Sequence, residues 1–321
     1  MFWMAMRALE WTLQTKPLTR PRRYTDGRLV DISKQNIMLD TLDLAFSFRG
    51  CEWDWSQGLY VPRETRPTSS RAAFATSTLI SSLSHAFICG AIHSAVKAFS
   101  PDTFGSVDGG TIFDDSLPPH LRYLRSSIIA TLFAFCIYSI LSASYELLTV
   151  VCVLLLRQRP SQWPPAFDSP WRATSLRDFW SRRWHQWFRQ MFIFLGGRPF
   201  SMLFGRIGGV IGVFLASGLF HYTPLLSLGH PPEIWYIVLP FGMMGVGLIL
   251  ERAIAGRNVG GWKGWIWTMS WLVLWGNLLV DGWVRAGVLG GLNIFKLDGA
   301  TFVRRPVEWL ARAFDEYLHA C

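Results

Sequence analysis

Long apolar runs with almost no charged residues constrain this chain more than any other feature of its sequence. A helix that crosses a bilayer needs about 20 mostly apolar residues. Three runs meet this need most clearly, namely Ser127 to Leu156, Ile234 to Leu250 and Gly264 to Val280. Weaker candidates are Ser77 to Phe99, Phe204 to Tyr222 and Ala286 to Val303. The sequence therefore predicts an all-α, multi-spanning transmembrane helical bundle of about five to six spans.

The overall composition supports a membrane protein and argues against a nucleic-acid-binding one. Charged residues make up 17% of the chain, against about 25% in soluble proteins. A net charge of +9 would suit nucleic acid, but the 17 tryptophans and the long uncharged runs do not suit a groove-binding domain, in which Lys and Arg line one solvated face. We therefore expect membrane lipids as partners and no nucleic acid. The five cysteines show no metal-ligand spacing, so we expect them to be packing residues and predict no metal site.

The distribution of charge predicts which segments share a side of the membrane. Loops rich in Lys and Arg stay in the cytosol, and if all six runs cross, every basic cluster falls on one side. The tail alternates apolar and charged residues at helical spacing, as an interfacial helix does. The expected organisation is an N-terminal interfacial or cytosolic segment (1–75), a membrane domain (76–303) and a cytosolic amphipathic tail (304–321).

The segment that begins at Ser175 predicts a basic amphipathic helix at the cytosolic surface. Ser175 followed three residues later by Asp178 is a variant capping box, which favours a helix start. Polar residues would then recur on one face at Asp178, Arg182, His185 and Arg189. Aromatic and apolar residues would occupy another face at Trp180, Trp184, Phe188 and Met191. An interfacial helix with no chemical role would show the same pattern.

An excess of arginine surrounds this predicted helix. Residues 157–206 hold nine arginines and two aspartates, an excess of seven positive charges. Anionic lipid headgroups are one partner for such a cluster. Arginine also makes bidentate contacts to phosphates, and coenzyme A carries phosphates and an adenine on which tryptophan could stack. Composition does not separate these two partners.

His221 ends a glycine-punctuated apolar run. Gly208, Gly212 and Ala216 repeat every four residues, the spacing that lets membrane helices approach closely. An imidazole at membrane depth is costly and usually functional, although a histidine at the interface is the alternative. Glu146, inside another run, also needs a partner, and we expect it to form a hydrogen bond that faces the bundle.

Three segments resemble the wax synthase branch of the membrane-bound O-acyltransferase family, especially fungal members that acetylate terpenoid alcohols. Arg49-Gly50-Cys51-Glu52-Trp53-Asp54-Trp55 is similar to a short Arg-Gly-x-x-Trp-x-Trp element of the fungal proteins. The stretch from Ser175 to His185 is similar to the Ser-Leu-x-Asp-Phe-Trp-x-Arg-Arg-Trp signature that Asn or His follows. Ser217-Gly218-Leu219-Phe220-His221 is similar to the Ser-Gly-x-x-His element. The two histidines lie 36 residues apart, a separation typical of the family.

The resemblance implies an endoplasmic reticulum enzyme that moves an acyl group, expected to be acetyl, from acyl-CoA to a hydroxyl of a hydrophobic acceptor of terpenoid type. Acyl-CoA would be a co-substrate, with no tightly bound cofactor. It implies His221 as the catalytic base and His185 as its companion. Residues near the coenzyme A entrance would be Arg177, Arg182, Arg183, Trp180 and Trp184.

Two other readings of the sequence stay open. The first is a long-chain wax or sterol ester synthase, and the second is a transporter or lipid-binding protein whose histidines line a polar pathway. We expect no acyl-enzyme, because no serine lies in a Gly-x-Ser-x-Gly elbow.

Overall fold

The computed structural model describes residues 58–256, 259–291 and 301–320, the helix at 2–12, and residues 18, 24–25, 28–29, 38, 41, 44, 49–51 and 53. Helices dominate these residues, which confirms the predicted all-α class. The longer ones are α1 (Phe2–Thr12), α3 (Arg71–Ala98), α4 (Pro119–Leu154), α7 (Arg198–Tyr222), α8 (Trp235–Ala255), α9 (Gly261–Arg285) and α11 (Thr301–Ala320). Two-residue strands β1 (Tyr24–Thr25) and β2 (Arg28–Leu29) pair antiparallel.

Short helical turns join the long helices. The α-helical ones are α5 (Leu176–Asp178), α6 (Arg189–Phe192) and α10 (Val288–Gly291). The π-helical ones are η4 (Phe179–Arg183) and η5 (Ile193–Gly197). The 3₁₀ turns are η2 (Pro160–Gln162), η3 (Pro170–Arg172) and η6 (Thr223–Ser227).

Four helical stretches in the described residues are long and apolar enough to cross a membrane. They are Arg71–Ala98, Pro119–Leu154, Arg189–Ser227 and Trp235–Ala255. Helix α9 covers the predicted span Gly264 to Val280 but is not among them, because polar residues such as Asn277 dilute its apolar run. The predicted span Ala286 to Val303 includes residues 292–300, which lie outside the described residues. Four of the five to six predicted spans are therefore long and apolar enough to cross a membrane.

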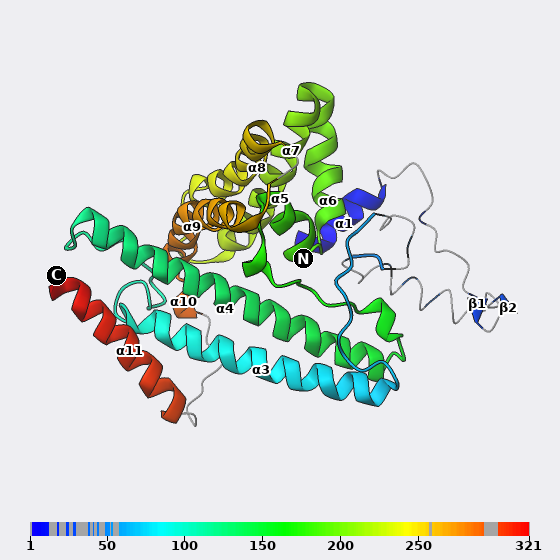
Figure 1. Ribbon diagram of the computed structural model, residues 1–321, viewed down its shortest axis with the longest axis horizontal. Coiled ribbons are helices and arrows are strands. Elements are labelled where there is room, and N and C mark those ends of the chain that lie inside the picture. The colour runs from blue at the N-terminus through cyan, green and yellow to red at the C-terminus, as the bar shows by residue number, and fades with distance from the viewer. Residues whose placement is uncertain are drawn as a thin grey trace.

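Helices α3 and α4 form an antiparallel pair, and α11 lies beside α3 (Figure 1). Glu146 on α4 accepts a hydrogen bond from the Ser81 hydroxyl (2.8 Å) and pairs with Nδ1 of His85 (3.0 Å), both on α3. The prediction that Glu146 forms a hydrogen bond facing the bundle is confirmed. Cys89 and Cys136 are buried between the same two helices.

Helices α7, α8 and α9 form a second group above this pair in Figure 1. They pack around a cluster that includes Phe214, Phe241 and Met244. Glycines allow the close approach, since a Cβ added at Gly218 would lie 3.0 Å from the Cα of Val238. The Asn277 amide on α9 donates to the Ser127 hydroxyl on α4 (3.0 Å), which joins the two groups.

Residues 189–222 form a helical hairpin and not one straight span. The chain turns at Phe204 and Gly205, where Gly205 has a φ of 63° and a ψ of −159°. Beyond the turn the chain packs back on itself, since a Cβ at Gly212 would lie 2.5 Å from the carbonyl oxygen of Gly196. The small-residue stripe predicted to allow close helix packing is confirmed, and its partner is the first arm of the same hairpin.

Helix α11 packs at the end of α4 that follows the aspartate-rich loop. Asp315 pairs with Arg125 (2.5 Å), and His319 contacts Asp114 of that loop (3.2 Å). Arg125 lies in the second turn of α4, whose 36 residues span about 54 Å. The tail therefore lies at the opposite end of α4 from the arginine-rich segment. Arg125 is 3% exposed, and a buried charge of this kind requires an anionic partner. The count of Lys and Arg in loops, from which the side of the tail was predicted, does not include this requirement.

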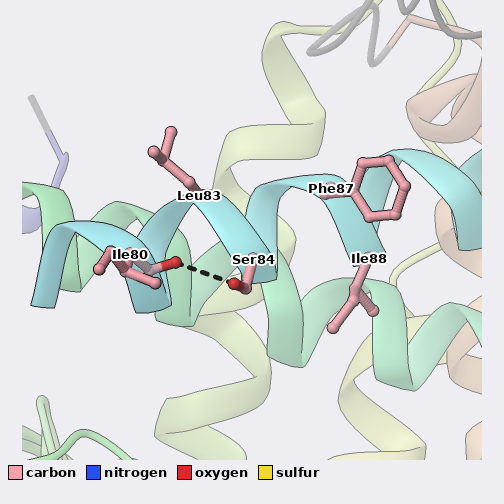
Figure 2. Close-up of a pocket in the computed structure, with 5 residues that line it drawn as sticks. All are labelled: Ile80, Leu83, Ser84, Phe87 and Ile88. Atoms are coloured by element: carbon pink, nitrogen blue, oxygen red, sulfur yellow. Dashed lines mark hydrogen bonds between the residues drawn. The ribbon is translucent and has the colours of Figure 1, made fainter. Parts of the chain in front are cut away.

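The outer face of α3 carries a shallow groove. Figure 2 shows its lining residues, which all come from this helix: Ile80, Leu83, Ser84, Phe87 and Ile88. The Ser84 hydroxyl donates to the carbonyl of Ile80 (2.9 Å), so its polar group is satisfied within the helix. This groove offers apolar contact and no chemical group.

Candidate active site

His221 lies one residue before the end of α7, held by its own helix and by aromatic rings. Its Nδ1 lies 2.7 Å from the carbonyl oxygen of Ser217, one turn earlier. Since a carbonyl only accepts, Nδ1 carries the proton and Nε2 keeps its lone pair. The ring stacks on Phe241 (4.6 Å between centroids, 24° between planes) and lies 6.5 Å from Trp283. This tautomer has the lone pair that a general base needs.

The segment that carries His185 begins as predicted but does not continue as one helix. The Ser175 hydroxyl accepts from the Asp178 N–H (2.9 Å), which confirms the helix start. The turn then widens to a π-helix, and Trp184 leaves helical geometry with a ψ of 154°. The Gln186 amide donates to the carbonyls of Trp180 and Trp184 (2.7 and 2.8 Å) and so caps this end. The predicted continuous stripe through Asp178, Arg182, His185 and Arg189 is therefore wrong.

The helical hairpin brings the two predicted catalytic histidines together. His185 precedes the first arm, which begins at Arg189, and His221 ends the second arm. Both lie at the base of the hairpin for this reason, although 36 residues separate them. They are near enough for a positive charge on His221 to lower the pKa of His185.

His185 is held in its neutral form. Desolvation lowers its pKa to about 3, with smaller contributions from the charges of His221 and Arg49. The ring stacks on Trp187 (4.7 Å, 26°) and meets Phe167 edge-on (5.7 Å). Its Nδ1 is buried and has no hydrogen-bond partner among the described residues. His185 is therefore a neutral imidazole with one nitrogen that no described residue satisfies.

Arg49, from the Arg-Gly-x-x-Trp-x-Trp segment, holds in place the aromatic rings that pack on His185. It is 4% exposed and donates to the carbonyls of Pro164 and Pro165 and to the Tyr145 hydroxyl (2.6 Å). Tyr145 in turn stacks on Trp187 (5.5 Å), the ring that stacks on His185. Glu52, Asp54 and Trp55 of that segment lie outside the described residues.

Glu251 is a residue of this region that the sequence reading missed. It is 6% exposed, near the end of α8, and its carboxylate accepts the backbone N–H groups of Leu176 (2.6 Å) and Arg177 (3.2 Å). It thereby attaches the segment that carries Trp180 and His185 to α8. The only sequence signal was a carboxylate directly after the apolar run Ile234 to Leu250.

The three arginines predicted to bind coenzyme A differ in their surroundings. Arg177 and Arg182 have exposed side chains, and Arg182 lies over the ring of Tyr60 (5.6 Å). Arg183 is held within the fold, because it pairs with Asp178 and donates to the carbonyl of Asp168 (3.0 Å). Arg177 and Arg182 are therefore the better placed to meet an incoming phosphate.

The two predicted tryptophans pack among aromatic rings. Trp180 meets Phe214 on α7 edge-on (5.5 Å). Trp184 stacks on Phe179 (5.5 Å, 17°) and contacts His185 (5.4 Å). Trp184 therefore lies beside His185, and Trp180 lies beside the helical core. These aromatic surroundings suit an apolar part of a substrate better than the adenine of coenzyme A.

Comparison with known proteins finds similarity to acyltransferases. Residues 163–243, which include both histidine segments, match the model of the membrane bound O-acyl transferase family. The chain is 29% identical to the acetyltransferase atnC of Arthrinium sp, over 42% of this chain and 36% of that protein. It is 26% identical to the acetyltransferase ple2 of Rhodocybe pseudopiperita, over 77% of this chain and 66% of that protein.

A plant relative extends the comparison. The chain is 29% identical to a probable long-chain-alcohol O-fatty-acyltransferase 9 of Arabidopsis thaliana, over 44% of this chain and 46% of that protein. It spans 36% and 20% of the lengths of two of the fungal relatives, and no solved structure matches it. Through residues 163–243 and these relatives, the chain is similar to the membrane bound O-acyl transferase family.

Proposed function

We propose that this protein transfers an acyl group from acyl-CoA to a hydroxyl of a hydrophobic acceptor, with His221 as the general base. The observation that carries this proposal is the bond between Nδ1 of His221 and the Ser217 carbonyl (2.7 Å). It fixes the tautomer whose Nε2 can accept a proton. Within the described residues, that nitrogen makes no hydrogen bond.

The proposed reaction is a direct transfer. Nε2 of His221 takes the proton of the acceptor hydroxyl while the hydroxyl oxygen attacks the thioester carbonyl. The tetrahedral intermediate then collapses, the carbon–sulfur bond breaks, and the coenzyme A thiolate takes the proton from the His221 imidazolium. Neutral His185 donates a hydrogen bond to the thioester oxygen as negative charge develops on it.

Coenzyme A enters on the side of the exposed arginines. Its phosphates would contact Arg177 and Arg182, whose guanidinium groups suit bidentate contacts to phosphate. Arg183 would act indirectly, since its contacts with Asp178 and Asp168 hold the segment in place. The rings of Trp180 and Trp184 would line the path of the apolar substrate beyond this entrance.

Two acyl donors are open. The names of the relatives atnC and ple2 favour acetyl-CoA, and a terpenoid-type alcohol is the acceptor we propose with it. The name of the plant relative favours a long-chain donor and a wax ester product. Turnover of acetyl-CoA compared with palmitoyl-CoA decides between them. We propose the endoplasmic reticulum as the membrane.

Replacement of His221 tests the proposed function. His221→Ala should lower acyl transfer by roughly 10²–10⁴, the usual contribution of a positioned general base, with a normal yield of folded protein. His185→Asn should be milder, because an amide still donates a hydrogen bond. Near-normal turnover of purified His221→Ala would reject the base. No consumption of any acyl-CoA by the parent would reject the enzyme and favour a transporter or lipid-binding protein.

A further inference from the structure

Two indole N–H groups near the site lack an acceptor. Nε1 of Trp180 and Nε1 of Trp275 are buried and have no hydrogen-bond partner in the described part of the chain. An indole nitrogen only donates, so the missing partner of each is an oxygen or another acceptor. Nearly all buried polar groups in proteins are satisfied, and the hydrocarbon core of a bilayer holds no water that could accept from them. These donors therefore need an explanation.

Both tryptophans belong to the aromatic shell around the cluster that contains Phe241, the stacking partner of His221. Both side chains are only partly buried, although their nitrogens are shielded. The neighbouring Trp271 differs, because its Nε1 donates to the Met243 carbonyl (3.1 Å). Trp267 also lacks an acceptor, but it lies farther along α9 from His221 and outside this shell.

The two free donors lie at a similar depth, away from His221. Trp180 contacts Phe214, which is seven residues before His221 on α7 and so about 10 Å along the helix. Trp275 is eight residues before Trp283, the ring beside His221 on α9, and so about 12 Å along that helix.

Helix α8 provides an independent check of this depth. A Cβ at Gly245 would lie 3.2 Å from Phe214, and one at Gly247 would lie 2.5 Å from Trp271. The level of Phe214 on α7 therefore corresponds to that of Trp271 on α9, and Trp275 lies one helical turn further along α9, toward Trp283.

We infer that Trp180 and Trp275 form a polar subsite for a second oxygen of the acceptor, about 10 Å from the hydroxyl that reacts at His221. The inference rests on the proposed function. The acceptor is then a rigid hydrophobic alcohol with a carbonyl or hydroxyl at its far end. A simple long-chain alcohol leaves both donors unpaired, and sites with unpaired buried donors discriminate against such ligands.

Two steroid probes that differ in one oxygen test this subsite. Testosterone carries a hydroxyl at one end of a rigid skeleton and a ketone at the other, and its 3-deoxy analogue lacks the ketone. The parent should bind testosterone more tightly, measured as ligand-induced thermal stabilisation in detergent without acyl-CoA. Trp180→Phe and Trp275→Phe should each weaken testosterone binding roughly three- to tenfold, the effect of one neutral hydrogen bond. Binding of the deoxy analogue should change little.

Trp271→Phe is the matched control, because the N–H it removes is already used inside the protein. It should affect both probes equally. If the parent shows no preference for the ketone, or if the Trp180 and Trp275 variants affect both probes equally, the subsite does not exist. Acyl transfer to any alcohol would still support the proposed function in that case. A ketone preference that both variants abolish would support the subsite even if no acyl transfer were detected.

Discussion

Replacing Glu251 by glutamine tests how the segment that carries His185 is held. The carboxylate accepts two backbone N–H groups, from Leu176 (2.6 Å) and Arg177 (3.2 Å), at a position that is 6% exposed. Glutamine keeps one acceptor oxygen and loses the charge. A hydrogen bond to a charged group contributes about 1.5–3 kcal/mol, so we expect a loss of about 2 kcal/mol of stability. For a chain of 321 residues that corresponds to about 3 °C in Tm.

Thermal unfolding of the purified variant in detergent measures this change, and acyl transfer should fall in the same variant because Trp180 and His185 lose their support. The matched control is Glu308→Gln, which removes the same charge from a pair with Arg304 and Arg312 on α11. Such helical pairs contribute only about 0.3–0.5 kcal/mol. Equal Tm values for Glu251→Gln and the parent would refute the argument, since the two backbone donors would then have another acceptor.

Two further predictions concern the arginines and the pH dependence of stability. Arg182→Ala should raise the KM for acyl-CoA more than the KM for the alcohol, which steady-state kinetics measures; an effect on the KM of the alcohol alone would contradict this prediction. Arg183→Ala should instead lower the yield of folded protein in gel filtration, because the pair with Asp178 is lost. Because folding lowers the pKa of His185 to about 3, the unfolded chain binds the extra proton as pH falls below about 6.5, so His185 makes stability decline between about pH 6.5 and pH 3. His185→Asn should flatten this decline in detergent unfolding curves, and parallel curves for variant and parent would contradict the argument.

Much of the architecture could be predicted from the sequence, and the candidate site residues were also proposed from it. The apolar runs predict α3, α4 and α8 because a bilayer-spanning helix leaves a composition signal that needs no tertiary information. Ser175 predicts a helix start because its cap is local. The motifs that end at His185 and His221 were recognised by resemblance, and the partner of Glu146 was expected because a carboxylate within a span requires one.

Local patterns could not predict where the chain turns back or breaks. Gly205 ends one arm of the hairpin through a positive φ, a choice that the glycine-rich run permits at several positions. The break at Trp184 depends on the Gln186 side chain, and the helical period carries no information about such a cap. The place of α11 depends on the partner that buried Arg125 requires.

The sequence by itself therefore determined a helical membrane protein with two histidines set in specific motifs. Only the tertiary structure brought those histidines together, because the hairpin at 189–222 returns His221 to the end where His185 lies. It also distinguished exposed Arg182 from Arg183, which is held by Asp178. The physical reason is that apolar runs and helix caps depend on residues close together in the sequence. The proximity of the two histidines and the pairing of the arginines depend on contacts between residues far apart in it.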